Sequence, residues 1–267
     1  WNIDSDVDLY EIYLNDVEQT PQNSTHFTPN EDLPDGSNKI QVRAKDVLGN
    51  VSNFGSHQVI VDSTPPSVPS PTSSSPTSNN SPTWNWSAIA GAVRYEVVLD
   101  DVAQGLQTNT FFTALNLSHG SHTIKVRSRD LVGNYSEYGI HVVEVDTKSP
   151  IIPTPTTETP TSNRTPTWNW QIISDAVLYE VKINDILVSS QTSTSFTSTT
   201  LNDGIHEIKV RAKDEVGNYS AYGNHMVLID TTAPNIPQPT TETPTNNNTP
   251  TWYWSVVLDA VEYEVVI

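Results

Sequence analysis

The chain has 267 residues, no cysteine, and a formal net charge of −18 from 31 acidic and 13 basic side chains. The missing cysteine excludes disulfide bonds and thiol chemistry, and the acidic excess opposes binding to nucleic acid or to an anionic membrane surface. No apolar run approaches the roughly 20 residues of a membrane-spanning helix, so we do not expect membrane insertion. From the acidic charge, we do not expect nucleic acid binding either.

Residues 1–62 begin inside a repeat whose elements recur further along the chain. A β-prone stretch at residues 10–14 precedes an Asn-Asp turn, and its counterparts lie at 95–99 and 179–183. We predict a short strand with a phenylalanine next, at residues 25–28, 110–113 and 194–197. A turn that contains glycine follows, at Gly36, Gly120 and Gly204.

The strand after this turn has the clearest alternation in the repeat. In residues 122–130, apolar or small side chains at positions 124, 126 and 128 alternate with cations at 125, 127 and 129. One face of the strand is therefore expected in the core and the other in water. The pattern Asp-x-x-Gly-Asn then predicts a hairpin loop at residues 46–50, 130–134 and 214–218. A last strand ends each copy, at Asp62, Asp146 and Asp230.

A proline-rich stretch joins each copy to the next. Its prolines lie at positions 65, 66, 69 and 71, then at 150, 153 and 155, and then at 234, 237 and 239. This spacing favours an extended edge strand or a polyproline segment, and the joints contain no glycine-rich hinge. We therefore predict short, stiff joints and an extended rod.

A Trp-x-Trp pair follows each joint and sets the period. The pairs begin at Trp84, Trp168 and Trp252, which are 84 residues apart, and Trp1 fits as the second tryptophan of an earlier copy. Two indoles at i and i+2 point to the same face of a strand. Burying each one removes about 150–250 Å² from water, which is worth on the order of 4–6 kcal/mol. We expect this pair to anchor the core.

The period divides the chain into four segments. We predict a partial module at residues 1–62 that lacks the first strands, and complete modules at 63–146 and 147–230. A second partial module at 231–267 is expected to hold the first three strands. We interpret such a chain as a segment of a longer repetitive protein.

The elements of one period add up to seven strands, which is the number of a β-sandwich. With the tryptophan strand, the Leu-x-x-Gly turn and the Val-Arg-Ala-Lys-Asp-x-x-Gly-Asn hairpin, the module resembles bacterial immunoglobulin-like or fibronectin type III-like domains. Such domains occur in tandem in giant extracellular adhesins and surface repeat proteins. The resemblance implies all-β, seven-stranded sandwiches, and a place outside a bacterial cell or on its surface.

No reactive cluster occurs once only, as an active site would require, so we do not expect an enzyme. His57, His141 and His225 recur at the period, which favours a structural role. We predict a stalk or shaft of an adhesin or surface filament, whose partners are the neighbouring repeats. One alternative is a filament subunit that assembles with other copies by strand complementation. Another is an accessory carbohydrate-binding module that uses Tyr135, Tyr138, Tyr219 and Tyr222.

Calcium is the one cofactor that the sequence suggests. In this topology the last strand of one module ends near the hairpin loop of the next, and carboxylates are the ligands that calcium prefers. The expected ligands at the joints are Asp62, Asp130, Asp146, Asp214 and Asp230, with Asp35 and Asp203 as possible additions. The competing interpretation is that Asp130 and Asp214 cap a turn and that Asp146 only ends a strand.

Overall fold

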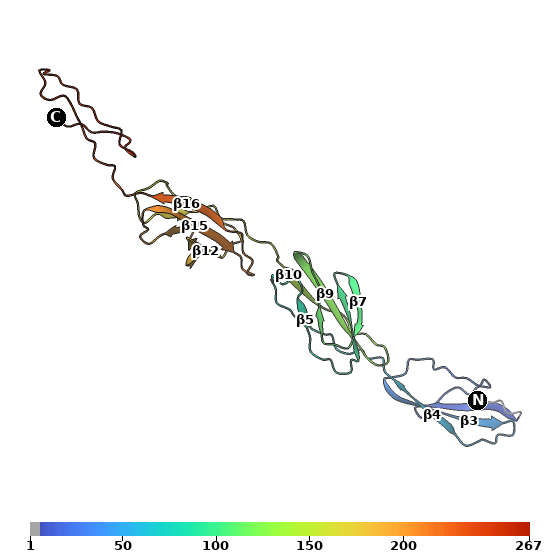
Figure 1. The fold of residues 1–267 in the computed structure, drawn as a ribbon. Coiled ribbons are helices and arrows are strands. Elements are labelled where there is room, and N and C mark those ends of the chain that lie inside the picture. The colour runs from blue at the N-terminus through green and yellow to red at the C-terminus, as the bar shows by residue number, and fades with distance from the viewer. Residues whose placement is uncertain (1–5) are drawn as a thin grey trace. The chain divides into compact units, whose positions relative to one another are not determined.

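The computed structural model describes residues 6–267, and these residues form sixteen β-strands and no helix (Figure 1). Accordingly, no helix in this described part is long and apolar enough to cross a membrane. The chain divides into two compact units, Trp1–Asp146 and Thr147–Ile267, each of which is described here on its own.

Residues 63–146 build a sandwich of two antiparallel sheets. The larger sheet has the strand order β10-β9-β6-β7, and the smaller one pairs β5 with β8. The strands are β5 (Thr83–Asn85), β6 (Arg94–Leu99), β7 (Val102–Gln107), β8 (Phe111–Thr113), β9 (Gly120–Arg129) and β10 (Gly139–Val145). The tryptophan strand therefore belongs to the small sheet and faces the large one.

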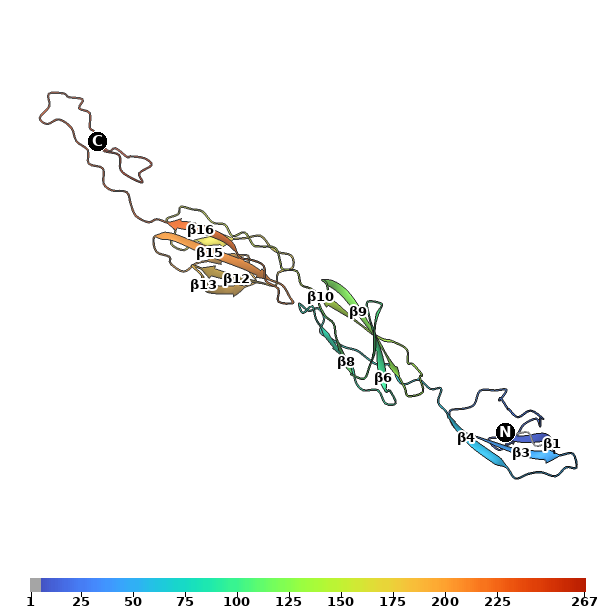
Figure 2. The ribbon, with the colours of Figure 1, turned by 45° about the vertical axis from the view of Figure 1, so that its right-hand side comes forward.

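Residues 147–230 repeat this arrangement, with the large sheet in the order β13-β12-β15-β16 (Figure 2) and β11 paired with β14. The strands are β11 (Thr167–Asn169), β12 (Leu178–Ile183), β13 (Ile186–Gln191), β14 (Ser195–Thr197), β15 (Gly204–Lys213) and β16 (Gly223–Ile229). The all-β fold with antiparallel sheets that the sequence predicts is confirmed.

The core of each sandwich is centred on the first tryptophan of the motif. Trp84 and Trp168 are both completely buried, whereas the asparagine between each pair of indoles is exposed. The second indole packs on a tyrosine of the large sheet, as in the edge-to-face pair of Trp170 and Tyr179 at 5.6 Å between ring centroids. Along β9, buried and half-buried residues alternate as predicted.

The proline-rich segment forms no strand and pairs with both sheets through isolated β-bridges. Thr72 pairs with Asn85 in the small sheet, and Thr77 pairs with Val145 in the large one. Proline has no N–H group, so this segment cannot form a continuous ladder. Six strands and this bridged segment thus take the place of the seven predicted strands.

A glycine at the start of the last strand leaves room for the proline segment. A Cβ atom added at Gly139 would lie 1.7 Å from the carbonyl oxygen of Pro69, and one at Gly223 would lie 1.7 Å from that of Pro153. The proline backbone therefore fits against the sheet only because this position has no side chain.

The first copy contains the large sheet alone, in the order β2-β1-β3-β4. Its strands are β1 (Val7–Leu14), β2 (Val17–Glu18), β3 (Gly36–Asp46) and β4 (Gly55–Val61). The strand predicted at residues 25–28 does not form. In the complete copies this strand pairs with the tryptophan strand, which has no counterpart among the described residues of the first copy.

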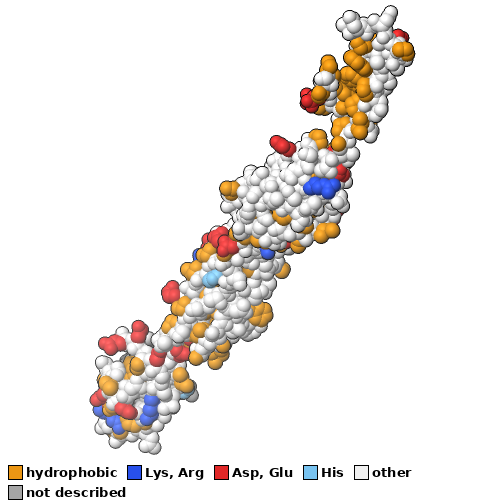
Figure 3. Space-filling view, turned by 90° about the vertical axis from the view of Figure 1, so that its left-hand side faces the viewer, with side chains coloured by type: hydrophobic (Ala, Val, Ile, Leu, Met, Phe, Trp, Pro, Cys, Tyr) orange, Lys and Arg blue, Asp and Glu red, His pale blue; other side chains and the backbone are white. Residues whose placement is uncertain are grey.

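The last copy, residues 231–267, contains none of the three predicted strands. One bridge remains, between Thr240 and Tyr253. The segment lacks the partners that pair with these strands in the complete copies, and its apolar side chains gather on the surface (Figure 3). Trp252, whose counterparts are fully buried, is 50% exposed here.

We predict that Trp168→Ala lowers the free energy of unfolding of residues 147–230 by about 3–5 kcal/mol, because it removes the largest side chain of that core. Guanidinium unfolding followed by circular dichroism measures this change. The neighbouring exposed residue provides the control, since Asn169→Ala on the same strand should change stability by less than about 0.5 kcal/mol. Equal effects of the two substitutions would contradict the assignment of the core.

Candidate functional site

The hairpin loop after β9 is organised by the carboxylate of Asp130. Asp130 Oδ1 accepts hydrogen bonds from the backbone N–H groups of Gly133 (2.7 Å) and Asn134 (2.8 Å), and Oδ2 accepts one from Asn134 Nδ2 (2.8 Å). Asp214 accepts the equivalent three bonds from Gly217 and Asn218. Both aspartates are buried. The turn-capping interpretation of these residues therefore matches the contacts they make.

Burial alone would raise the pKa of Asp130, but the hydrogen bonds from Asn134 and Gly133 outweigh it and hold the pKa below its ordinary value. The ionised carboxylate is the form that can accept all three bonds. The loop is thus most stable when Asp130 is charged.

The same loop reaches the end of the preceding module. Asn134 Nδ2 also donates a hydrogen bond to the carbonyl oxygen of Asp62 (2.9 Å). The sequence predicted that Asp62 and Asp130 approach each other, and the amide of Asn134 is what links them. The loop therefore has a second role as a contact at the first joint.

The remaining predicted calcium ligands lie at the ends of the last strands. Asp62 Oδ1 accepts a hydrogen bond from Thr64 N (3.2 Å), and Asp230 Oδ1 accepts one from Thr232 N (3.0 Å). Asp146 Oδ1 lies 3.1 Å from Nδ1 of His119. Within residues 6–267, no group of three or more histidine or acidic side chains is placed to hold a metal ion. Calcium at the joints stays a prediction.

A further aspartate, Asp35, ties the outgoing chain to its module. Asp35 Oδ1 accepts hydrogen bonds from the amide (2.8 Å) and hydroxyl (2.7 Å) of Ser63, and Asp35 Oδ2 accepts one from the hydroxyl of Thr64. These bonds lower the pKa of Asp35, the hydroxyl of Ser63 contributing most. The sequence suggested Asp35 only as an additional calcium ligand. Its contacts with the linker depend on distant residues, and no local motif indicates them.

The outer face of the large sheet carries an arginine stacked on tyrosines. Arg127 Cζ lies 4.2 Å from the ring centroid of Tyr135 and 4.7 Å from that of Tyr138, and its Nε donates a hydrogen bond to Glu96 (2.5 Å). Cation–π contacts of this kind stabilise exposed sheet faces by about 0.5–1 kcal/mol each.

The next copy repeats the stack with Arg211, Glu180, Tyr219 and Tyr222. Arg211 Cζ lies 3.9 Å from the ring centroid of Tyr219, so the guanidinium covers one face of that ring. A sugar platform requires open ring faces. These four tyrosines, which the carbohydrate-binding alternative relies on, are half-buried and engaged with charged side chains of their own module.

The recurring histidine of the last strand contacts the tryptophan anchor. The indole N–H of Trp84 donates a hydrogen bond to His141 Nδ1 (3.1 Å). The donor lies inside the core, where an unmet N–H group would be costly. His141 therefore has a structural role in its own module, but the equivalent atoms of the next copy, Trp168 Nε1 and His225 Nδ1, have no hydrogen-bond partner.

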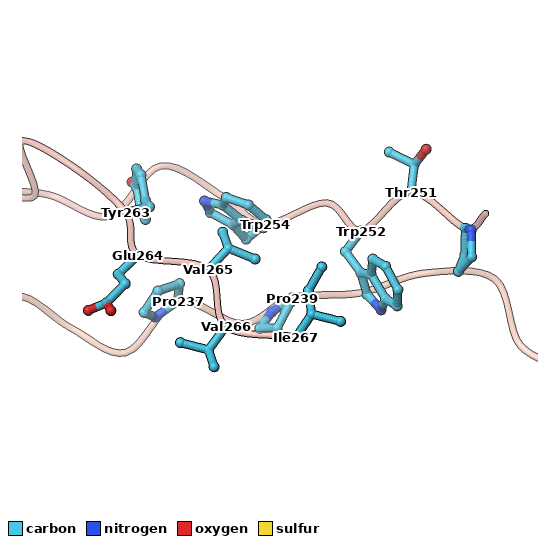
Figure 4. Close-up of a pocket in the computed structure, with 11 residues that line it drawn as sticks. Pro237, Pro239, Thr251, Trp252, Trp254, Tyr263, Glu264, Val265, Val266 and Ile267 are labelled. Carbon is cyan, nitrogen blue, oxygen red and sulfur yellow. The ribbon is translucent and has the colours of Figure 1, made fainter.

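The two partial copies carry open apolar surfaces that belong to opposite halves of one sandwich. On the first, a cavity of about 390 Å³ is lined by residues of β1, β3 and β4, among them Tyr10, Val42, Gly55 and His57. On the last, a hollow of about 730 Å³ is lined by prolines, Trp252, Trp254 and the C-terminal valines (Figure 4). Each surface corresponds to a contact that is closed in the complete copies.

Comparisons with known proteins place the chain beside repeat modules of larger proteins. No protein-family model matches it. It is 29% identical over 244 residues to Exoglucanase B of Cellulomonas fimi, and 30% identical over 194 residues to Chitinase A1 of Niallia circulans. These matches cover 82% and 66% of the chain but only 22% and 28% of the two enzymes. The chain therefore spans about a quarter of these relatives.

Two solved structures of fibronectin type III modules are among those similar to this chain. The fibronectin(III)-like modules of Clostridium thermocellum CbhA have 16% sequence identity and a TM-score of 0.39, covering 60% of this chain and 93% of that structure. The central fibronectin-III array of RIM-binding protein has 17% identity and a TM-score of 0.27, covering 86% and 90%. The modules of this chain resemble fibronectin type III-like repeat domains, as the motifs indicated.

We predict that Asp130→Asn lowers the melting temperature of residues 63–146 at neutral pH, because the new amide faces Asn134 Nδ2, another donor. If the side-chain amide of Asn134 rotated to present its oxygen to the new amide, that oxygen would also face the carbonyl oxygen of Asp62. The hydrogen bond from Asn134 Nδ2 to Asp62 would then be lost. Since the folded pKa of Asp130 is depressed, the stability from its charge is present above pH ~4 and is lost as pH falls through the folded pKa. The difference from the natural chain should therefore shrink in acid.

Calorimetry of both chains between neutral and acidic pH measures this difference. Glu137→Gln provides the matched control, because Glu137 is an exposed carboxylate in the same segment. A difference for Asp130→Asn that stayed constant with pH would show that its charge does not support the loop.

Proposed function

We propose that this chain is a non-catalytic spacer of a larger extracellular bacterial protein, a series of sandwiches that holds other domains at a distance. The carrying observation is that Asp130 and Arg127, which recur at the period as Asp214 and Arg211, make the contacts described above within their own modules. Asp130 caps a turn, Arg127 stacks on tyrosines, and His141 accepts a bond from a core indole. Side chains engaged in this way build a scaffold.

The shaft of an adhesin or surface filament is the finer form of this proposal. The acidic surface favours solubility and limits self-association of such a shaft. The similarity to parts of an exoglucanase and a chitinase supports a second setting, in which the modules connect the domains of a secreted polysaccharide-degrading enzyme. The spacer role is the same in both settings.

Deleting residues 147–230 removes one whole period and joins Asp146 to Thr231 in register. We expect this deletion to shorten the maximum dimension measured by small-angle X-ray scattering, while the melting temperature of residues 63–146 stays the same, because stability is nearly a sum over modules. The 267-residue chain should neither hydrolyse nor bind cellulose or chitin. An unchanged maximum dimension, or hydrolysis by the purified chain, would overturn the spacer proposal.

A further inference from the structure

The strand β9 begins with a histidine whose two ring nitrogens both face hydrogen-bond acceptors. His122 Nδ1 lies 2.7 Å from Oδ2 of Asp100, which is in the turn between β6 and β7. His122 Nε2 lies 2.9 Å from the carbonyl oxygen of Ser118, which is in the turn before β9. A carbonyl oxygen and an ionised carboxylate only accept hydrogen bonds, so the ring has to donate both. These two bonds, which we call the His122 contact, therefore require a doubly protonated, positively charged ring.

The His122 contact is largely enclosed by the module. The side chain of His122 is 10% exposed. The other oxygen of the carboxylate, Asp100 Oδ1, accepts the backbone N–H of Thr123 (2.8 Å), so the turn after β6 is held to β9 at two adjacent residues. His122 also pairs with Val143 of β10. A charged ring in this position depends on its two acceptors, because little water reaches it.

The charges near the ring favour its positive form. Burial alone would lower the pKa of His122. The bonds to Asp100 and Ser118, together with the negative charge of Glu144 on β10, outweigh burial and raise this pKa above its ordinary value. The other charged side chains of the adjoining turns and of β9 are paired with one another, Lys125 with Asp101 and His119 with Asp146.

The next copy has neutral residues at both acidic positions. Asn184 stands in place of Asp100, and Leu228 stands in place of Glu144. The backbone of the turn is unchanged, with a φ of 48° at Asp100 and of 49° at Asn184. The two copies therefore compare a carboxylate with an amide in the same turn.

The histidine of this next copy, His206, needs only one ring proton. Its Nε2 faces the carbonyl oxygen of Asn202 (2.8 Å), and its Nδ1 faces Asn184 Nδ2 (3.0 Å). Asn184 Oδ1 accepts the backbone N–H of Glu207, which leaves the NH₂ group of the amide beside the ring. One ring nitrogen donates and the other accepts, so a second proton would add no hydrogen bond.

We propose that the His122 contact is a pH-sensitive device that stabilises residues 63–146 while the ring is charged and stops doing so in alkaline solution. The matching contact of residues 147–230 lacks this response. When His122 loses a proton, one ring nitrogen presents a lone pair to an acceptor, and one of the two bonds is lost. The inference concerns a single module and does not require the spacer proposal.

The direction of the response follows from the raised pKa. The folded pKa of His122 lies above the unfolded value of about 6.5, so the stabilisation is fully present below pH ~6.5. It is lost as pH rises through the folded pKa.

The chemistry of the two copies can be exchanged by the single substitutions Asp100→Asn and Asn184→Asp. Thermal unfolding of the 267-residue chain at about pH 6 and about pH 9, followed by the NMR signals of each copy, measures the two melting temperatures separately. We expect Asp100→Asn to lower the melting temperature of residues 63–146 by about 4 °C or more at the lower pH, and the difference to shrink toward zero at the higher pH. Asn184→Asp should give residues 147–230 a melting temperature that falls between the same two pH values.

Asp101→Asn is the matched control, because it removes the neighbouring carboxylate, which pairs with Lys125. It should leave the pH response of residues 63–146 in place. Nitrogen NMR of the imidazole adds a readout that a purely structural role would not move, since Asp100→Asn should lower the titration midpoint of His122 and Asp101→Asn should change it much less. A melting-temperature difference for Asp100→Asn that is equal at both pH values, or an unchanged midpoint of His122 in that variant, would overturn the proposal.

Discussion

The sandwich of each module depends on one interaction, the burial of the tryptophan strand against the four-stranded sheet. The indole of Trp168 is fully buried between the sheets, and the proline segment enters only because Gly223 leaves space beside Pro153. Among the described residues, the first copy forms the large sheet and no strand at residues 25–28, and residues 231–267 form no strand.

This asymmetry has a simple physical origin. Both sheets contain a pairing between residues that are distant in sequence, since β6 pairs with β9 from Leu99↔Ile124 to Arg94↔Arg129 and Trp84 pairs with Phe112. The pairing of the tryptophan strand is only three residues long, however, so this strand depends on packing against the large sheet as well. It therefore needs most of the module to be present.

The local sequence pattern was enough to predict where the strands of the complete copies lie along the chain. It was not enough to predict which side chains the polar residues contact. The alternation along β9 and the glycine turns are local signals, and the structure agrees with both. The strand predicted at residues 25–28 failed because its β-propensity has no effect without a pairing partner. Sequence also could not show that Arg127 lies over Tyr135 or that the Trp84 indole reaches His141. These contacts join side chains on different strands.

In a repetitive chain, the residues that recur in every copy and the residues that differ between copies indicate different things. A residue that recurs, such as Asn134 and Asn218, serves what all copies need. Two positions can also differ together, as where His119 and Lys148 stand in place of the hydrogen-bonded pair Asp35 and Thr64. Because Asp35 holds Ser63 and Thr64 with a single carboxylate, replacing the acceptor removes the reason for the hydroxyl partner as well. The two replacements are therefore linked by the chemistry of this one contact.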